Sequence, residues 1–341
     1  SEDHPFPHTP PMAAAHEYLR GGEEPMSLAI LQGFVANEGD AWDYTLDVAG
    51  RSYDEVRTRP DLDLPAPPAT VAALLAVSAE EPGSLAEEVT GAYLEQARLL
   101  GQRTAELHLA LAAGTGPAFA PEPFSLLYQR SLYQSLRSLT AQTFQGLRKL
   151  LNRLPEEGRA EAEAVLACEE ALLARFRRVT AAKIDAVRTR IHGDFHLGQV
   201  LYTGNDFLII DFEGEPVRPI SERRIKRSPL CDVAGMLRSF QYAAYATLFS
   251  RTAGAAPSSE ELMAMRRWAD YWCFWVSATY LRGYLDRAAG APFLPATPDD
   301  LETLLEVFVL EKVVYEVAYE MNNRPTWLSI PLSGILRQVG A

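Results

Sequence analysis

Two aspartates, Asp194 and Asp211, lie next to short segments with strand character. Thr203–Asp206 has the residue types of a tight turn, and an apolar run follows it. We therefore predict a β-hairpin with strands Gln199–Tyr202 and Phe207–Asp211. Asp194 precedes the first strand and Asp211 closes the second, so the hairpin should bring both carboxylates to one end of a small sheet.

This spacing suits phosphoryl transfer. Enzymes of the protein-kinase type use one Asp to accept the proton of the substrate hydroxyl and an amide five residues later to hold a metal, and the Asp of an Asp-Phe-Gly turn holds Mg²⁺. Here the amide of Gln199 lies five positions after Asp194, and Asp211 begins the sequence Asp-Phe-Glu-Gly. The alternative is a surface hairpin with solvated acids, which the full pattern from His192 to Phe212 disfavours.

Three stretches of the chain resemble the maltokinase family. They are His-Gly-Asp-Phe-His-Leu-Gly-Gln-Val-Leu at 192–201, Ile-Ile-Asp-Phe-Glu-Gly-Glu-Pro at 209–216 and Glu-Arg-Arg-Ile-Lys-Arg-Ser-Pro-Leu at 222–230. The family includes a kinase domain fused behind trehalose synthase in many bacteria, and its wider relatives are aminoglycoside phosphotransferases and eukaryotic-like kinases. The resemblance extends from about Phe6 to Leu336.

The resemblance implies ATP-dependent phosphorylation of maltose to maltose 1-phosphate, which feeds α-glucan and glycogen synthesis. Asp194 is then the general base, and His196 contacts phosphate. Gln199 and Asp211 hold Mg²⁺, a cation that suits oxygen ligands. Glu213 is close enough in the sequence to hold either metal or sugar.

Supporting residues follow from the same resemblance. His192 is expected to brace the catalytic loop, and Asp232 is expected to hydrogen-bond the loop backbone. The family usually has an arginine just before that Asp, whereas this chain has Cys231, a departure expected to weaken an ion pair near the loop.

A sugar site is expected on a C-terminal helix. Tyr315 and Tyr319 lie four positions apart and so share one face, with Glu311 one turn earlier. An aromatic platform with interleaved polar groups suits a sugar, whose C–H faces stack while its hydroxyls accept and donate hydrogen bonds. The alternative is an amphipathic surface helix. The family resemblance implies that the disaccharide lies here, with Lys312, Tyr315 and Tyr319 as contacts. The full set of predicted substrate contacts is Glu213, Lys312, Tyr315, Tyr319, Arg324 and Trp327.

The expected fold class is α+β and protein-kinase-like. Residues 1–58 are predicted to be a remnant of the N-lobe with the hinge strand 26–35, after a lead-in (1–25) with little structure of its own. Residues 59–341 are predicted to form a helical C-lobe that carries the catalytic hairpin 190–216. In the hinge, the backbone around Gln32, Gly33 and Phe34 would pair with adenine.

Asp40 is a candidate N-cap of the helix that follows the hinge, and His108 is expected to be a core histidine. Residues 60–68 are rich in proline and predict a linker. Periodicity predicts helices at 87–112, 128–154, 157–184, 259–287 and 298–323.

Composition excludes several classes of protein. The net charge of −13 disfavours general nucleic-acid binding. The sequence contains no run of 18 apolar residues, so no membrane span is predicted. The first residues do not resemble a signal peptide. Three widely spaced cysteines indicate a reducing cytoplasm rather than a metal site.

The usual lysine of the kinase N-lobe has no counterpart in this sequence, because the first lysine is Lys149. No P-loop motif is present either. We therefore expect either a fragment or a chain whose N-lobe lies in a longer polypeptide, for example behind a trehalose synthase domain. Two alternatives remain open: a kinase acting on glucosamine or an aminoglycoside, and a non-catalytic sugar-binding module.

A basic cluster, Arg223, Arg224, Lys226 and Arg227, lies within this acidic chain. Two interpretations fit this cluster equally well. It is either a phosphate-binding or activation-segment-like element, or a loop whose cations are solvated or paired with other protein groups.

Overall fold

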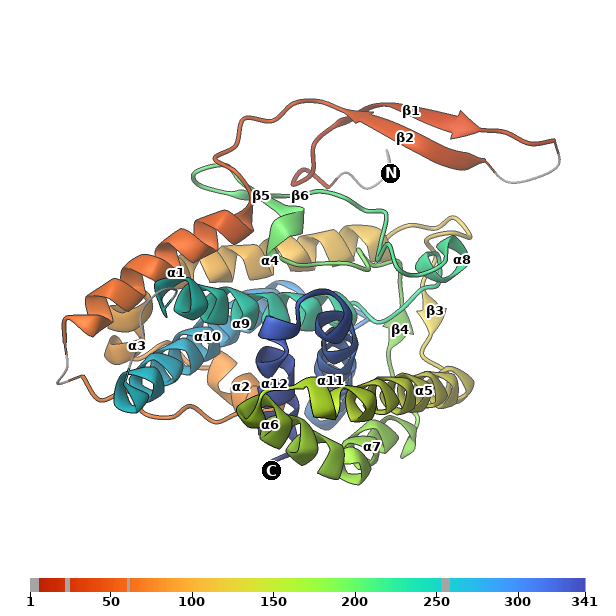
Figure 1. Ribbon diagram of the computed structural model, residues 1–341. Helices are drawn as coiled ribbons and strands as arrows, with labels where there is room; N and C mark the ends of the chain where they lie inside the picture. Colours follow the sequence, from red (N-terminus) through yellow and green to blue (C-terminus); the bar gives the residue numbers. More distant parts are fainter. Residues whose placement is uncertain (1–5, 22–24, 60–61, 253–257, 341) are drawn as a thin grey trace.

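The computed structural model describes residues 6–21, 25–59, 62–252 and 258–340. Within them the chain is mainly helical, with three two-stranded antiparallel sheets. Helices pack into one body, and a β-ribbon lies above it (Figure 1). No helix among the described residues is both long and apolar enough to cross a membrane.

The ribbon consists of β1 (Met12–Tyr18) and β2 (Met26–Gln32). The expectation that residues 1–25 carry little structure is therefore wrong for the described part of that segment. The sequence Met-Ala-Ala-Ala-His-Glu-Tyr has no β-branched residue, and it becomes a strand by pairing with β2. All of β1 is exposed, as is β2 up to Leu31.

The predicted hairpin is confirmed as β5 (Val200–Tyr202) paired with β6 (Phe207–Ile209). Both of its edges are partly covered: the N–H of Ile209 donates to the carbonyl of His8 (2.8 Å), and the N–H of Tyr202 donates to the carbonyl of Gly39 (3.0 Å). These contacts fix the hairpin against two segments that lie far before it in the sequence.

Helices from the first part of the chain pack against the hairpin. α1 (Ala41–Arg57) begins at its predicted N-cap, because Asp40 accepts a hydrogen bond from the N–H of Asp43. α2 (Val71–Ser78), α3 (Ser84–Thr90) and α4 (Tyr93–Ala112) follow. A single helix over 87–112 is therefore wrong: the chain breaks at Gly91, which has a φ of +59°. The predicted linker 60–68 lies partly outside the described residues; its described part, from Leu62, contains no helix or strand.

A second correction concerns the middle of the chain. α5 (Leu126–Leu150) matches the helix predicted at 128–154, but the helix predicted at 157–184 is two helices, α6 (Glu156–Ala167) and α7 (Glu169–Arg177). Cys168 ends one helix and caps the next. A short sheet pairs β3 (Glu122–Pro123) with β4 (Val187–Arg188) and leads into residues 190–199, the predicted catalytic loop.

The C-terminal helices complete the body. After the four-residue α8 (Ile220–Arg223) come α9 (Leu230–Thr252), α10 (Ser259–Arg287), α11 (Pro298–Asn323) and α12 (Ser329–Val339). The predicted bounds of α10 and α11 are confirmed. A capping box of Ser258 and Glu261 begins α10, and Thr297 caps α11 just before Pro298.

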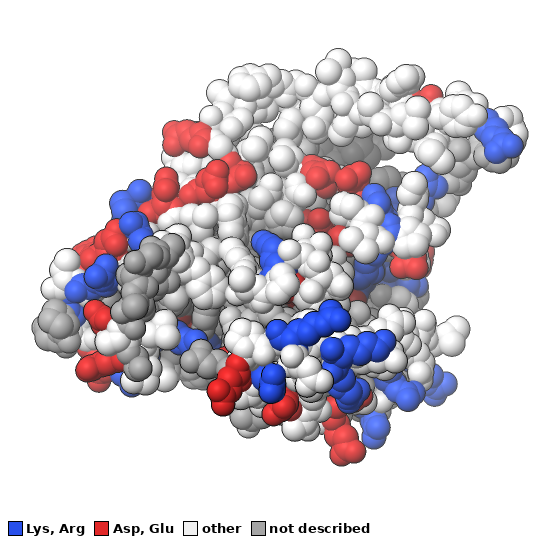
Figure 2. Space-filling model, viewed as in Figure 1, with Lys and Arg blue, Asp and Glu red and all other residues white. Residues whose placement is uncertain are grey.

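Charge is unevenly distributed over the face shown in Figure 2. Acidic side chains gather along α1, and basic side chains gather lower down, where α5 and α6 lie (Figure 2). Although the net charge of the chain is −13, this face therefore carries separate acidic and basic areas.

α4 and α10 cross with their backbones almost in contact. A Cβ atom at Gly101 would lie 2.1 Å from the carbonyl oxygen of Tyr280. We therefore expect Gly101→Ala to destabilise the protein by about 1–3 kcal/mol in urea unfolding, because the helices must separate. Gly158→Ala in α6 is the matched control, since its surroundings are open and alanine favours a helix by about 0.5–1 kcal/mol. Equal stabilities for Gly101→Ala and the wild type would contradict the close approach of the α4 and α10 backbones at Gly101.

Candidate functional site

Asp232, on the first turn of α9, fixes the loop that carries Asp194. Its carboxylate accepts hydrogen bonds from the backbone N–H groups of His192 (2.7 Å) and Gly193 (2.9 Å). His108 of α4 lies 3.1 Å from the same carboxylate and 3.0 Å from the hydroxyl of Tyr284. The contacts expected of Asp232 are therefore present. His108 is a core histidine as expected, and it also supports the loop indirectly.

Electrostatics keep Asp232 charged. Burial raises its pKa, but the hydrogen bond and charge of His108 outweigh burial and hold the pKa below its ordinary value. Asp232 is thus a buried anion whose oxygens are all engaged in holding other groups.

His192 links the catalytic loop to the second acid. Its Nε2 lies 2.8 Å from the carbonyl of Ile210, the residue before Asp211. Gly193 also approaches the turn after Asp211, because a Cβ there would lie 3.4 Å from the Cα of Gly214. The loop before β5 and the turn after β6 are therefore in direct contact.

Gln199 and Asp211 lie together at the end of the hairpin. The Gln199 amide donates to Asp211 Oδ2 at 3.0 Å. Among the described residues, Asp211 alone of the non-glycine residues has a φ between +20° and +160°, at +63°, and such strained backbone is frequent at functional sites.

These side chains fit Mg²⁺ by donor chemistry. An amide oxygen and a carboxylate are hard oxygen ligands, and Mg²⁺ usually takes one or two protein ligands and completes its shell with phosphate and water. Within the described residues, no cluster of three His, Cys, Asp or Glu side chains forms a complete protein cage for a metal.

A cavity of about 600 Å³ opens beside Asp194. Its wall comes from the catalytic loop, residues 215–217, α9 and one face of α11, with Asp40 and Trp42 at one side. Its other polar side chains are Asp194, His196, Glu215, Ser239, Tyr242, Lys312, Tyr315, Glu316, Tyr319, Glu320 and Arg324.

Two basic side chains flank Asp194. Lys312 Nζ lies 3.9 Å from Oδ1, and His196 Nε2 lies 3.9 Å from Oδ2. Burial and the charge of Lys312 lower the pKa of His196 to about 4, so its ring is neutral near pH 7. Its Nδ1 accepts from the N–H of Gly198 (3.1 Å), which places the proton on the Nε2 that faces Asp194.

The predicted tyrosine platform is present. The Tyr315 and Tyr319 rings stack with centroids 6.4 Å apart, and both line the cavity. Burial and the nearby Glu215 raise the pKa of Tyr315, so its hydroxyl stays protonated.

Two carboxylates of α11 line the floor of the cavity. Glu316 pairs with Arg238 of α9 (2.6 Å), and Glu320 accepts from both Arg324 (2.7 Å) and the hydroxyl of Tyr242 (3.1 Å). Each carboxylate is therefore buried with a cation beside it, which offsets the cost of burying its charge.

Several predicted residues lie elsewhere. The side chain of Glu213 is 60% exposed, lies 3.7 Å from Arg223 and is outside the cavity wall. Trp327 stacks on Tyr242 behind the wall, with centroids 6.1 Å apart. Neither side chain lines the cavity, and the metal role of Glu213, which does not depend on lining the cavity, stays a prediction.

The predicted adenine contacts also lie away from the cavity. None of Gln32, Gly33 and Phe34 lines it, and the N–H of Gly33 already donates to the carbonyl of Pro11 (2.8 Å). The Phe34 side chain is 91% exposed.

Sequence reasoning missed Glu215, Tyr242, Glu316 and Glu320. A signal existed for two of them: Lys312, Glu316 and Glu320 follow one another at four-residue intervals and so share one face of α11. Nothing local marks Tyr242, because its position depends on how α9 packs against α11.

Three members of the basic cluster are paired structurally. Lys226 bonds to the carbonyl of Pro117 and to Glu122, Arg227 forms an ion pair with Glu311 (2.6 Å), and Arg223 donates to backbone carbonyls. Of the two interpretations, structural pairing is the better supported for these three. Because Glu311 pairs with Arg227, its carboxylate is engaged outside the cavity and does not line it.

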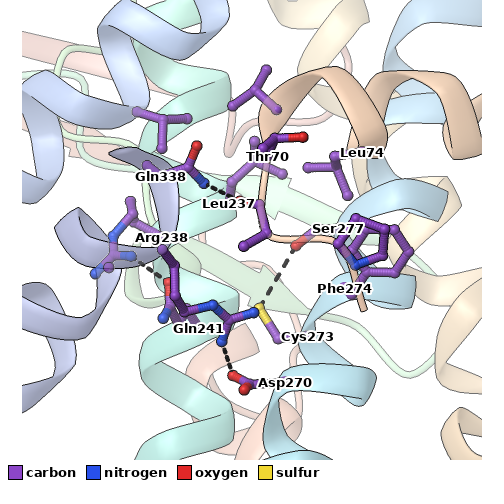
Figure 3. A pocket seen from close by; sticks show the side chains of 16 residues that line it. Thr70, Leu74, Leu237, Arg238, Gln241, Asp270, Cys273, Phe274, Ser277 and Gln338 are labelled. Atoms are coloured by element: carbon purple, nitrogen blue, oxygen red, sulfur yellow. Dashed lines mark hydrogen bonds and ion pairs between the residues drawn. The ribbon is translucent and has the colours of Figure 1, made fainter. Parts of the chain in front are cut away.

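A smaller cavity, of about 90 Å³, is lined by residues of α2, α9, α10 and α12 (Figure 3). Its polar side chains engage protein groups: Arg238 bonds to Gln241, Arg337 to Asp270, and Gln338 to the carbonyl of Ala69 (2.8 Å). This volume does not admit a sugar or a nucleotide, so the 600 Å³ cavity is the candidate site.

Comparison with known proteins agrees with this geometry. The sequence model of a phosphotransferase enzyme family (APH) matches residues 62–256. A glucosamine kinase of Mycolicibacterium smegmatis is 32% identical over 152 residues, covering 41% of this chain and 32% of that protein. A glucosamine kinase of Streptacidiphilus jiangxiensis is 24% identical over 318 residues, covering 92% of this chain and 58% of that protein. The chain thus spans about a third of the first relative and less than two thirds of the second.

Solved structures match the fold. One crystal form of a glucosamine kinase superposes with a TM-score of 0.70 at 22% identity, covering 99% of this chain and 68% of that one. A glucosamine kinase in complex with glucosamine, ADP and inorganic phosphate gives a TM-score of 0.69 at 21% identity, covering 97% and 68%. These matches establish a kinase-like phosphotransferase fold.

Proposed function

Because the chain belongs to the phosphotransferase enzyme family, we propose that it transfers the γ-phosphoryl group of ATP to a hydroxyl of a small sugar. The observation that carries this proposal is the position of Asp194, which lines a 600 Å³ cavity together with a tyrosine platform. Its loop is in contact with the turn that carries Asp211.

In this mechanism the sugar binds in the cavity with one hydroxyl against Asp194. The hydroxyl proton passes to Asp194 as the sugar oxygen bonds to the γ-phosphorus, and the bond from phosphorus to the ADP oxygen breaks. Gln199 and Asp211 would hold Mg²⁺, which when bound offsets the negative charge of the ATP phosphates. His192 and Asp232 hold the loop so that Asp194 keeps its position.

The β1–β2 ribbon and residues up to 58 are proposed to belong to the N-lobe and hinge, with the nucleotide between them and the helical body. The support is the exposure of apolar side chains on the ribbon and just after it: Leu28 is 59% exposed, Leu31 63% and Phe34 91%. Exposed apolar surface of this kind marks an interaction site. An attached trehalose synthase domain and a cytoplasmic location stay predictions.

Glucosamine is one candidate acceptor. Both curated relatives carry the name glucosamine kinase. The cavity wall also has an excess of carboxylates over cations, which would attract a protonated amino group. Of these carboxylates, Glu215 lies beside the tyrosine platform, where its charge adds to burial in raising the pKa of Tyr315.

Maltose is the second candidate, and a different observation favours it. The cavity is large enough for a disaccharide, and two aromatic rings, Tyr315 and Tyr319, line it. The resemblance of residues 213–229 to maltokinases points to the same acceptor.

The proposal is tested with the natural full-length polypeptide, ATP and Mg²⁺. Glucosamine, maltose, glucose and kanamycin are each supplied, ADP release is followed, and the product is identified by mass spectrometry. We expect one sugar to give a kcat/KM at least about tenfold above the others, since a site that hydrogen-bonds its substrate discriminates strongly. ADP release with no phosphorylated acceptor would reject the proposal. Calorimetric binding of sugar without any transfer would indicate a non-catalytic module instead.

A further inference from the structure

Lys312 occupies an unusual place on the cavity wall. Its ammonium lies 3.9 Å from Asp194 Oδ1 and 5.1 Å from the centre of the Tyr315 ring, and its side chain is 28% exposed. The ring holds the ammonium by a cation–π interaction, which fixes its direction toward Asp194.

The separation from Asp194 is informative. A distance of 3.9 Å is too long for a direct hydrogen bond, and one oxygen atom placed between the two groups could bond to both. A sugar hydroxyl in that place would donate its proton to Asp194 and accept a hydrogen bond from Lys312.

The charges around Asp194 single out Lys312. His196 on the other side is neutral near pH 7, because its pKa is about 4. Among the described residues of the cavity wall, the other cation is Arg324, which is held by both oxygens of Glu320. Lys312 is thus the cation closest to where a phosphoryl group would meet Asp194.

The residue type agrees with this role. Only four of the 32 basic residues of the chain are lysines, so arginine is the default cation here. A lysine presents a compact point charge that can follow a moving group, whereas the guanidinium of an arginine is a rigid fork.

We propose that Lys312 is a catalytic residue of phosphoryl transfer. The inference rests on the proposed function. Its ammonium donates to the attacking sugar oxygen and then faces the phosphoryl group as that group bonds to this oxygen. The sugar proton goes to Asp194, the oxygen–phosphorus bond forms, and the electron pair of the broken bond leaves with ADP. Lys312 keeps its proton throughout and stabilises the negative charge of the transition state.

The test compares Lys312→Met with Lys149→Met in the full-length protein. Lys149 lies exposed in the last turn of α5, so the control makes the same chemical change away from the cavity. We expect Lys312→Met to lower kcat by about 10²–10³-fold, the usual cost of removing one donor to transition-state charge. A residue that only binds sugar would instead raise KM and leave kcat unchanged.

Rescue separates loss of the charge from a folding defect. In Lys312→Ala, added ethylammonium should restore part of kcat with saturation, and tetramethylammonium, which has no N–H, should not. A near-wild-type kcat in Lys312→Met, or a low kcat that ethylammonium does not raise, would overturn the inference. A wild-type protein that phosphorylates no sugar would instead reject the proposed function, and this inference with it.

Discussion

Replacing Asp194 by Asn is expected to lower kcat for sugar phosphorylation by about 10²–10⁴-fold, the range that a general base contributes. The substitution keeps the size of the side chain and removes its ability to take a proton. Folding should be unaffected, because the carboxylate's nearest basic side chains, the charged Lys312 and the neutral His196, are both 3.9 Å away, too far for a direct hydrogen bond. Initial-rate kinetics together with thermal unfolding measure the two quantities separately.

Glu213→Gln is the matched control for that substitution. It makes the same chemical change nearby in the sequence, at a side chain that is 60% exposed and outside the cavity. We expect its kcat and its Tm to match the wild type. A kcat for Asp194→Asn within about tenfold of the wild type would exclude Asp194 as the base. A large loss in Glu213→Gln would show that the metal or sugar role predicted for Glu213 holds after all.

Replacing Asp232 by Ala is expected to destabilise the protein by about 3–5 kcal/mol, the usual cost of removing one partner of a buried charged pair. Asp232 is 2% exposed, and its loss leaves the N–H groups of His192 and Gly193 and the ring of His108 without their acceptor. Urea unfolding at neutral pH measures the difference. Asp286→Ala is the control, because its carboxylate is 63% exposed and lies 3.9 Å from Arg282.

The pH dependence of that difference gives a second check. The folded state holds the pKa of Asp232 below its ordinary value, so its stabilising contribution is present at neutral pH and is lost as the pH falls through the folded pKa. The stabilities of the wild type and of Asp232→Ala should therefore converge in acid. A constant gap down to pH 3 would mean that the charge of Asp232 contributes little. Asp232→Ala with unchanged stability would show that other contacts hold the loop.

Local sequence patterns were sufficient to predict the β5–β6 hairpin and the bounds of two long helices, α10 and α11. The turn at Thr203–Asp206 lies between two apolar runs, and the order of these residues fixes the register of β5 and β6. The bounds of α10 and α11 follow from caps that can be read locally, Ser258 with Glu261 and Thr297 before Pro298. Patterns failed at β1, whose strand depends on its partner, and at Gly91 and Cys168, where one apolar periodicity continues through a break in the helix.

The sequence by itself identified the candidate groups: Gln199 and Asp211 meet at the end of the hairpin, and Asp194 lies in the loop just before it. Only the tertiary structure decided which distant residues meet them. His108 and Asp232, 124 positions apart, form one buried pair, and α11 brings Lys312 beside Asp194. No periodicity encodes such contacts, because they depend on how helices pack across a shared core.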